Sequence, residues 1–313
     1  MKRPSCLLAL LLVPSLLWAA KPREIKIQLN WKPEPQFGGF YAANLAKVDE
    51  AQGLAFNPRP GGSGTPTVQL LVNEKIDFAI VSAEEILISN DRNPKKPVIA
   101  LFAVYQTNPQ MIMCHAEKKF ESLKDVFASS VTLSWQSGLS YAQFLRKKYP
   151  KTKVKFAPYS GGIGAFVGNK NLCQQGFVTS EPLLANKAGR ATRNFLVSEE
   201  GFNPYTTVLA VRKNWLEKNQ ELAKKVVSIT RSGWVSYLEN TVPTNAYMNQ
   251  LNPAMDLRTA MESAKAQEKL IRPTDAFQVG EMSADRWQRL IRQLKDMKLI
   301  KTELKAADQF AVF

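Results

Sequence analysis

The sequence predicts a two-lobed α/β protein, a clamshell whose lobes are joined by hinge crossings. Two observations support this prediction. Short apolar strands alternate with helical segments along most of the chain, which is the pattern of βαβ units on a parallel sheet. The alternation breaks near Thr107 and again near Pro204. The chain between these breaks is therefore expected to form one α/β unit, and the chain outside them another.

The N-terminus has the layout of a secretory signal peptide. Lys2 and Arg3 precede an apolar stretch at residues 7–18, and the small residue Ala20 marks a cleavage site. The stretch is shorter than the roughly 20 residues that a membrane-spanning helix needs, although a retained anchor is the alternative. We expect residues 1–20 to be removed and the mature protein to be soluble, exported and periplasmic.

The length of the chain favours two lobes. A chain of 313 residues is too long for one typical core. We expect lobe 1 to comprise residues 21–107 and 205–313, and lobe 2 to comprise residues 108–204. The C-terminal part would then pack back on lobe 1, so the chain would cross between the lobes twice.

Local patterns predict the elements of lobe 1. Residues 24–30 alternate apolar and polar side chains, which predicts a strand, and Pro33 and Pro35 prevent its continuation. Thr65 followed by Pro66 is typical of an N-cap and a first helical residue. The other expected strands are 54–57, 76–81 and 98–105, and the expected helices are 40–52, 65–73 and 83–89.

The same reasoning gives lobe 2 and the C-terminal part. The expected strands of lobe 2 are 111–114, 131–134, 154–157 and 176–179, and its expected helices are 141–148 and 181–187. A strand at 206–211 follows the second break. Three amphipathic helices are then expected at 222–238, 259–270 and 284–298, because apolar residues recur there at spacings of three and four.

Charge and cysteine content restrict the possible partners. The net charge is +15, but the Lys and Arg residues are scattered, and export argues against a nucleic-acid partner. Cys6 precedes the apolar stretch, whereas a lipid-modified cysteine would follow it. Cys114 and Cys173 either form a disulfide or are buried thiols. His115 is the only histidine in the sequence and no cysteine cluster is present, so we expect no metal, no cofactor and no catalytic residue. We also expect the protein to be a monomer.

Candidate binding residues follow the predicted strands. In open α/β sheets, ligands bind outside the carboxyl ends of the strands. The residues at these positions combine aromatic rings, neutral hydrogen-bonding groups and one carboxylate. They are Asn30, Trp31, Phe37, Ser63, Gly64, Thr65, Ser82, Tyr105, Trp135, Tyr159 and Glu181.

This set suits a flat, polar, heteroaromatic ligand. Rings offer faces for stacking, and a carboxylate such as Glu181 favours an amino group. The glycine-rich loop at residues 61–65 offers an alternative, because backbone N–H groups at a helix start bind anions. Structural roles remain open for several members: Trp31 and Trp135 as core residues, Glu181 as a favourable first helical residue, and the loop as a tight turn.

Three segments resemble one known family. Residues 29–43 (LNWKPEPQFGGFYAA), the pair 61–64 (GGSG) and 77–80 (DFAI), and residues 174–182 (QQGFVTSEP) are similar to successive signatures of a thiamine-pyrimidine-related family of binding proteins and enzymes, also called no-message-in-thiamine-like. The resemblance implies the type II periplasmic binding protein fold and an ABC transporter permease at the inner membrane as partner. It also implies that Asn30 and Trp31 line the pocket from the first lobe and that Glu181 faces them from the second.

Departures from the family pattern leave the ligand open. Glu74 replaces a usual glycine, Ser180 replaces a usual asparagine, and residues 171–173 lack a usual acidic residue. Family members bind pyrimidine precursors, flavins, taurine, alkanesulfonates or nitrate. We expect a pyrimidine or another heteroaromatic vitamin precursor, captured for import by an ABC transporter. The alternatives are a pyrimidine-precursor synthase-like enzyme and a protein that binds an anion such as a sulfonate, feeding a transporter or a sensor.

Overall fold

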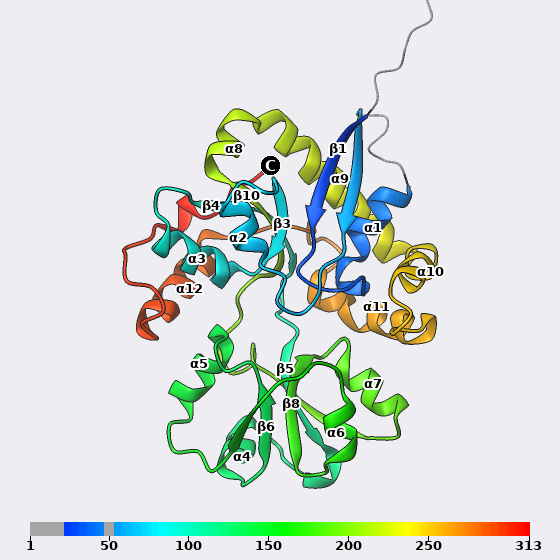
Figure 1. Ribbon diagram of the computed structural model, residues 1–313, viewed down its shortest axis with the longest axis vertical. Coiled ribbons are helices and arrows are strands. Elements are labelled where there is room, and N and C mark those ends of the chain that lie inside the picture. The colour runs from blue at the N-terminus through cyan, green and yellow to red at the C-terminus, as the bar shows by residue number, and fades with distance from the viewer. Residues whose placement is uncertain (1–21, 47–52) are drawn as a thin grey trace, which may run out of the picture.

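The computed structural model describes residues 22–46 and 53–313, which form two lobes, each built on a five-stranded sheet (Figure 1). The predicted signal peptide lies outside the described residues. The strands of the first sheet are β1 (Arg23–Gln28), β2 (Leu54–Arg59), β3 (Phe78–Val81), β4 (Val98–Tyr105) and β10 (Thr206–Arg212). Those of the second are β5 (Gln110–His115), β6 (Thr132–Trp135), β7 (Lys155–Pro158), β8 (Leu172–Phe177) and β9 (Thr192–Leu196). The prediction of a two-lobed α/β fold is confirmed.

Both sheets are mixed, so the prediction of parallel sheets is wrong in this respect. The first sheet has the order β2-β1-β3-β10-β4, and β10 runs antiparallel to both β3 and β4. The second has the order β7-β6-β8-β5-β9, and β5 runs antiparallel to β8 and β9. The antiparallel strands are the first strands after each break in the βα alternation, where the chain enters the other sheet from the opposite direction.

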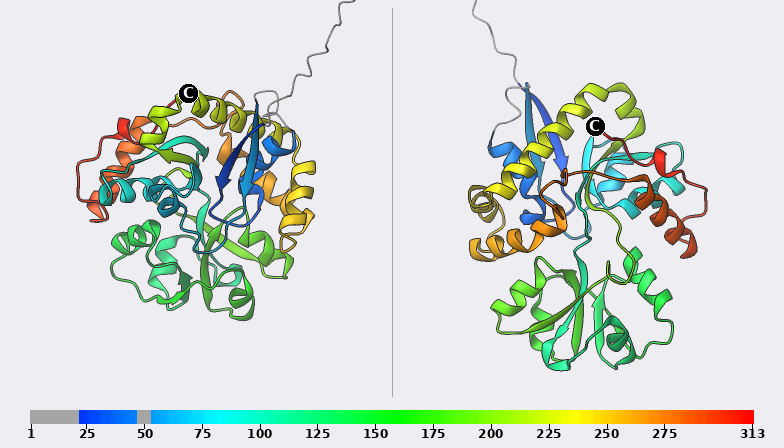
Figure 2. Two further views of the ribbon diagram at one scale, coloured as in Figure 1. Left: turned by 45° about the horizontal axis from the view of Figure 1, so that its top comes forward. Right: turned by 180° about the vertical axis from the view of Figure 1, so that it is seen from behind.

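Helices cover the sheets of both lobes. The C-terminal helices lie with the first sheet, and α9 crosses behind it (Figures 1 and 2). Lobe 1 carries α1 (Gly38–Leu45), α2 (Thr67–Val72), α3 (Ala83–Arg92), α8 (Lys213–Lys218), α9 (Gln220–Glu239), α10 (Val242–Leu251), α11 (Leu257–Ile271) and α12 (Ala284–Asp296). Lobe 2 carries α4 (Leu123–Ala128), α5 (Ser140–Lys148), α6 (Gly164–Gly168) and α7 (Glu181–Lys187). Short 3-10 turns are η1 (Pro35–Phe37), η3 (Ala116–Lys118) and η4 (Ala306–Asp308).

Two local predictions are corrected. Helix α2 begins at Thr67, and Pro66 rather than Thr65 precedes it, because the Thr65 hydroxyl accepts a hydrogen bond from the Gly62 N–H within the loop at 2.9 Å. Strand β8 begins at Leu172, before the expected range. Its early part contains Gln174 and Gln175, polar residues that are buried because their amides are hydrogen-bonded inside lobe 2.

Two crossings join the lobes, from β4 to β5 and from β9 to β10. Asn108 on the first crossing is bonded to the second crossing twice: its N–H donates to Asn203 Oδ1 at 2.8 Å, and its side-chain amide donates to the Pro204 carbonyl at 3.1 Å. Arg286 of α12 donates to the carbonyls of Gln106 and Asn203, one on each crossing. The hinge is therefore a hydrogen-bonded unit anchored to lobe 1.

The core of lobe 2 contains a disulfide between Cys114 and Cys173. These residues lie on the paired strands β5 and β8, with 4.3 Å between their Cα atoms, and both are buried. Of the two possibilities that the sequence left open, the structure has the bridge. Among the described residues, no helix combines the length and apolar character that crossing a membrane requires.

Candidate ligand-binding site

The lobe 1 side of the candidate site is the turn that follows β1. Trp31 is half-buried there, and its indole N–H donates to Glu34 Oε1 at 3.3 Å. Helices from the C-terminal part hold the backbone of this turn. Asn252 donates to the Pro33 carbonyl at 3.1 Å, and Gln267 donates to the Pro35 carbonyl at 2.8 Å. A proline-rich turn has few N–H donors, so its carbonyls are available to these amides.

Gly61 brings the β2–α2 loop against the same turn. The Gly61 N–H donates to the Trp31 carbonyl at 2.9 Å. A Cβ atom at position 61 would lie 2.2 Å from the Leu29 carbonyl oxygen, so only glycine allows this approach. The glycine-rich loop thus fixes the backbone of Trp31 through this hydrogen bond.

The lobe 2 side of the site is Glu181, the first residue of α7. Its Oε2 accepts the Phe177 N–H at 2.7 Å, and its Oε1 accepts the Tyr159 hydroxyl at 3.2 Å. A Cβ atom at Gly176 would lie 2.6 Å from Glu181 Oε2, so the absence of a side chain at position 176 makes room for the carboxylate. The Glu181 carboxylate is therefore held in place by its own lobe.

The two acidic residues interact across the junction of the lobes. Burial raises the pKa of Glu34 to about 8, and the charge of Glu181 contributes to the rise. Burial also raises the pKa of Glu181, but the Phe177 N–H and the Tyr159 hydroxyl stabilise its ionised form. With a pKa of about 8, Glu34 is therefore largely protonated at neutral pH. The site thus places two buried carboxyl groups, one from each lobe, close enough for their charges to interact.

Tyr105 adds a buried ring at the same junction. Its hydroxyl donates to Gln267 Oε1 at 2.6 Å, and its ring meets the edge of Phe177 of lobe 2, with 6.5 Å between the ring centroids. Burial raises its pKa well above the ordinary range, although a hydrogen bond with Thr179 of lobe 2 opposes the rise. The Tyr105 side chain therefore contacts both lobes as a neutral phenol.

The structure brings together five of the predicted residues. Trp31, Tyr105, Tyr159 and Glu181 are connected through the contacts described above, and Asn30 is the half-buried neighbour of Trp31. These residues come from four different strand ends, as the rule for open α/β sheets anticipates.

Two predicted aromatic residues are core residues instead. Phe37 is fully buried in the hydrophobic core of lobe 1. Trp135 is 1% exposed and stacks on Phe156 of lobe 2 at a centroid distance of 4.8 Å. Both rings follow strands in the sequence, but their side chains turn into a core, where an aromatic ring loses the most water-exposed area.

The remaining predicted residues have local structural roles. Ser82 caps α3, because its N–H and hydroxyl both donate to Glu85 Oε2, at 2.8 and 3.1 Å. Ser63 and Gly64 are exposed in the loop before α2. Thr65 closes that loop through its backbone N–H, which donates to the Gly62 carbonyl at 3.1 Å. The N–H groups of Gly62 and Thr65 are thus used within the loop, which weakens the loop as an anion site.

Sequence reasoning missed Glu34 and Gln267 as site residues. Glu34 lies in a proline-rich break, which gives no indication that its carboxyl group interacts electrostatically with Glu181 of the other lobe. Gln267 lies on α11, far along the chain from the strands that it contacts, and an isolated glutamine on an amphipathic helix is no signal. A search for a second carboxyl group near Trp31 would have found Glu34, but no local pattern identifies Gln267.

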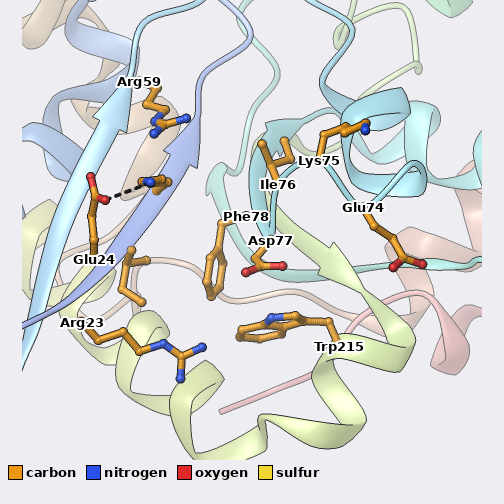
Figure 3. Close-up of a pocket in the computed structure, with 11 residues that line it drawn as sticks. Arg23, Glu24, Arg59, Glu74, Lys75, Ile76, Asp77, Phe78 and Trp215 are labelled. Carbon is orange, nitrogen blue, oxygen red and sulfur yellow. Dashed lines mark ion pairs between the residues drawn. The ribbon is translucent and has the colours of Figure 1, made fainter.

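A separate hollow of about 370 Å³ lies beside the first half of β1 (Figure 3). Arg23, Lys75 and Glu74 contribute charges of both signs to its lining, and Trp215 and Phe78 form its apolar part. Asp77 in the same wall is already paired with Arg212 at 2.8 Å. This hollow shares no residue with the site between the lobes.

Comparison with known proteins gives a family and a fold. The family model described as NMT1/THI5 like matches residues 34–242. No curated protein sequence matches the chain. The resemblance that the sequence motifs indicated is therefore confirmed at the level of the family.

Solved structures match nearly the whole chain at low identity. The alkanesulfonate-binding protein from Xanthomonas axonopodis pv. citri, bound to MOPS, has a TM-score of 0.69 at 10% identity and covers 94% of this chain and 100% of its own. The periplasmic nitrate-binding protein from Synechocystis PCC 6803 has a TM-score of 0.66 at 12% identity, covering 93% and 86%. A Candida albicans protein described as having the generic periplasmic binding protein fold has a TM-score of 0.64 at 13% identity, covering 92% and 96%. At these identities the matches establish the fold.

Proposed function

The chain belongs to the NMT1/THI5-like family, and from this membership and the geometry of the junction we propose that it is an exported solute-binding protein of an ABC import system. Its ligand is a small organic molecule with an amino-bearing aromatic ring, of the pyrimidine-precursor type. The ligand binds between the lobes and is delivered to the membrane permease. Solved structures of the same fold include a ligand-binding component of an ABC-type import system from Staphylococcus aureus, an alkanesulfonate-binding protein and a periplasmic nitrate-binding protein, which supports this function.

One observation supports the proposed class of ligand. Together with burial, the charge of Glu181 on lobe 2 raises the pKa of Glu34 on lobe 1, and Glu34 is hydrogen-bonded to the indole ring of Trp31. Glu181 offers a fixed carboxyl group to an amino group, and Glu34 adds a second buried carboxyl group from the other lobe. Trp31 offers a half-buried ring for stacking. A ligand with an aromatic ring and an amino group can stack on the Trp31 ring and place its amino group beside the two carboxyl groups.

Capture between the lobes requires that the ligand stabilise the closed arrangement. A ligand that contacts Trp31 and Glu181 binds the closed state preferentially, because these residues belong to different lobes. The closed arrangement has further support at the rim. Lys187 of α7 forms an ion pair with Asp256 next to α11, with 2.5 Å between the charged atoms.

An anionic ligand is less well supported. Glu181 would repel an anion, and the Gly62 and Thr65 N–H groups of the glycine-rich loop are already used. The enzyme alternative also lacks support from residues. Nε2 of His115 lies 3.0 Å from the Phe166 carbonyl, and the imidazole ring of His115 stacks on the phenyl ring of Phe166. Cys114 forms the disulfide with Cys173. These groups serve the lobe 2 core.

Native mass spectrometry of the exported protein, purified without denaturation, tests the proposal. We expect an organic molecule with the mass of an aminopyrimidine to co-purify with the wild type and to be depleted in Glu181→Gln. The control variant Glu117→Gln, which changes an exposed residue of lobe 2, should retain the molecule. Trp31→Ala should weaken binding by about 2 kcal/mol through lost stacking and buried area. A co-purified sulfonate or nitrate that survives Glu181→Gln would overturn the proposed ligand class.

A further inference from the structure

A small hollow of about 50 Å³ lies between the second crossing and α12, next to the hinge. Its lining contains two arginines and two residues with side-chain amides, and one of these amides, that of Gln293, donates to the Gly201 carbonyl at 2.8 Å. The lining residues are Gly201, Asn203, Arg286, Arg289, Leu290 and Gln293. A water molecule needs about 10–15 Å³ by the same kind of measure, so the hollow has room for a small ion with part of its hydration.

Arg286 is a largely buried cation without an acidic partner. It donates to the Gln106 carbonyl, to the Asn203 carbonyl at 2.9 Å and to Asn203 Oδ1 at 3.1 Å, and it also forms a hydrogen bond with Tyr205. Its guanidinium also lies 3.8 Å from the centre of the Tyr205 ring. Among the described residues, no carboxylate forms an ion pair with it.

Arg289 increases the positive charge at the same place. It lies one helical turn after Arg286 and is exposed, and no residue in the described ranges accepts a hydrogen bond from its guanidinium or pairs with it. Burial, with a smaller contribution from the charge of Arg289, lowers the pKa of Arg286 to about 10 against the opposing effect of Tyr205. Both arginines also lie in the first two turns of α12, where the helix dipole favours negative charge.

We propose that this hollow is a binding site for a small inorganic anion of the size of chloride, held between the Arg286 and Arg289 guanidiniums. The anion supplies the negative charge that the described residues do not provide. Gly201 and Asn203 belong to the second crossing, whereas the arginines belong to lobe 1, so the bound anion fastens the crossing to α12. The site is independent of the organic ligand proposed above.

Thermal unfolding at constant sodium concentration tests the site, with chloride replacing gluconate. At ten times the dissociation constant, a bound anion raises the Tm of a chain of this size by about 2 °C. We expect this rise in the wild type and in Arg292→Ala, which removes the same charge from an exposed position on α12 outside the hollow. We expect the rise to be lost in Arg289→Ala, which removes an exposed side chain and leaves the core intact.

Anomalous diffraction from bromide-soaked crystals locates the ion directly. The proposal predicts a peak between the Arg286 and Arg289 guanidiniums in the wild type and none in Arg289→Ala. An equal chloride-dependent rise in Tm for the wild type and Arg289→Ala overturns the proposal, and so does a bromide map without a peak in the hollow. Neither result bears on capture of the organic ligand, which mass spectrometry measures separately.

Discussion

Replacing Glu34 by glutamine should make the protein more stable at neutral pH. Burial and the charge of Glu181 raise the pKa of Glu34 from 4.5 to about 8. Between these values the folded protein keeps a proton that the unfolded chain has released, so stability falls as pH rises through this window. At about 1.4 kcal/mol per pH unit, the loss reaches about 3 kcal/mol by pH 7.

Glutamine has no proton to lose and keeps an oxygen that accepts the Trp31 indole N–H. We therefore expect Glu34→Gln to match the wild type near pH 4.5 and to exceed its free energy of unfolding by up to about 3 kcal/mol at pH 7. Urea unfolding at pH 5, 6, 7 and 8 measures the difference. The matched control is Glu217→Gln, at an exposed glutamate of α8. Because the charge of Glu181 contributes to the raised pKa of Glu34, Glu181→Gln should narrow the pH range over which Glu34 reduces stability.

Parallel pH curves for the wild type and Glu34→Gln would refute this reasoning. They would mean that Glu34 titrates alike in the folded and unfolded chain, and hence that it is neither desolvated nor close to Glu181. Another buried carboxyl group, Glu84, also has a pKa raised to about 8 by burial, but it contributes equally to both proteins. The difference between the curves isolates Glu34.

Three further predictions concern the disulfide, the site and the rim. The double variant Cys114→Ala/Cys173→Ala should lose up to about 4 kcal/mol of stability, because the bridge closes a loop with a sequence separation of 59; an unchanged urea midpoint would contradict this. Gly176→Ala should displace the Glu181 carboxylate and weaken aminopyrimidine binding at least tenfold with the fold retained; unchanged affinity in calorimetry would count against the carboxylate. Lys187→Ala should weaken the same binding by no more than about fivefold, and less at high salt, since exposed ion pairs contribute about 0–1 kcal/mol; a salt-independent effect would exclude a rim ion pair.

The sequence predicts most of the elements because their signals are local. Strand β4 at Val98–Tyr105 and helix α7 at Glu181–Lys187 have the expected bounds. Strand direction is not a local property. Nothing in residues 206–211 indicates that this strand enters the first sheet antiparallel between β3 and β4, so the parallel sheet was the wrong expectation.

The candidate site was predictable where side chains follow strands, and less so where packing decides. Trp31 and Trp135 look alike in the sequence, since each follows or ends a strand. In the structure Trp31 is half-buried and packs against the core of lobe 1, whereas Trp135 is fully buried in a hydrophobic core. Glu34 became a site residue only through its position opposite Glu181. Such contacts between distant segments depend on how the lobes meet, which no local pattern records.

Calorimetric titration of the mature protein with a methylated aminopyrimidine and with its deaminated analogue tests the central claim most directly. Glu181 should accept from the amino group, so the aminopyrimidine should bind at least tenfold more tightly than the analogue in the wild type. In Glu181→Gln that preference should shrink, because one charge-assisted hydrogen bond, worth about 1.5–3 kcal/mol, is lost. Equal affinity for the two compounds in the wild type, or an undiminished preference in Glu181→Gln, would contradict the account.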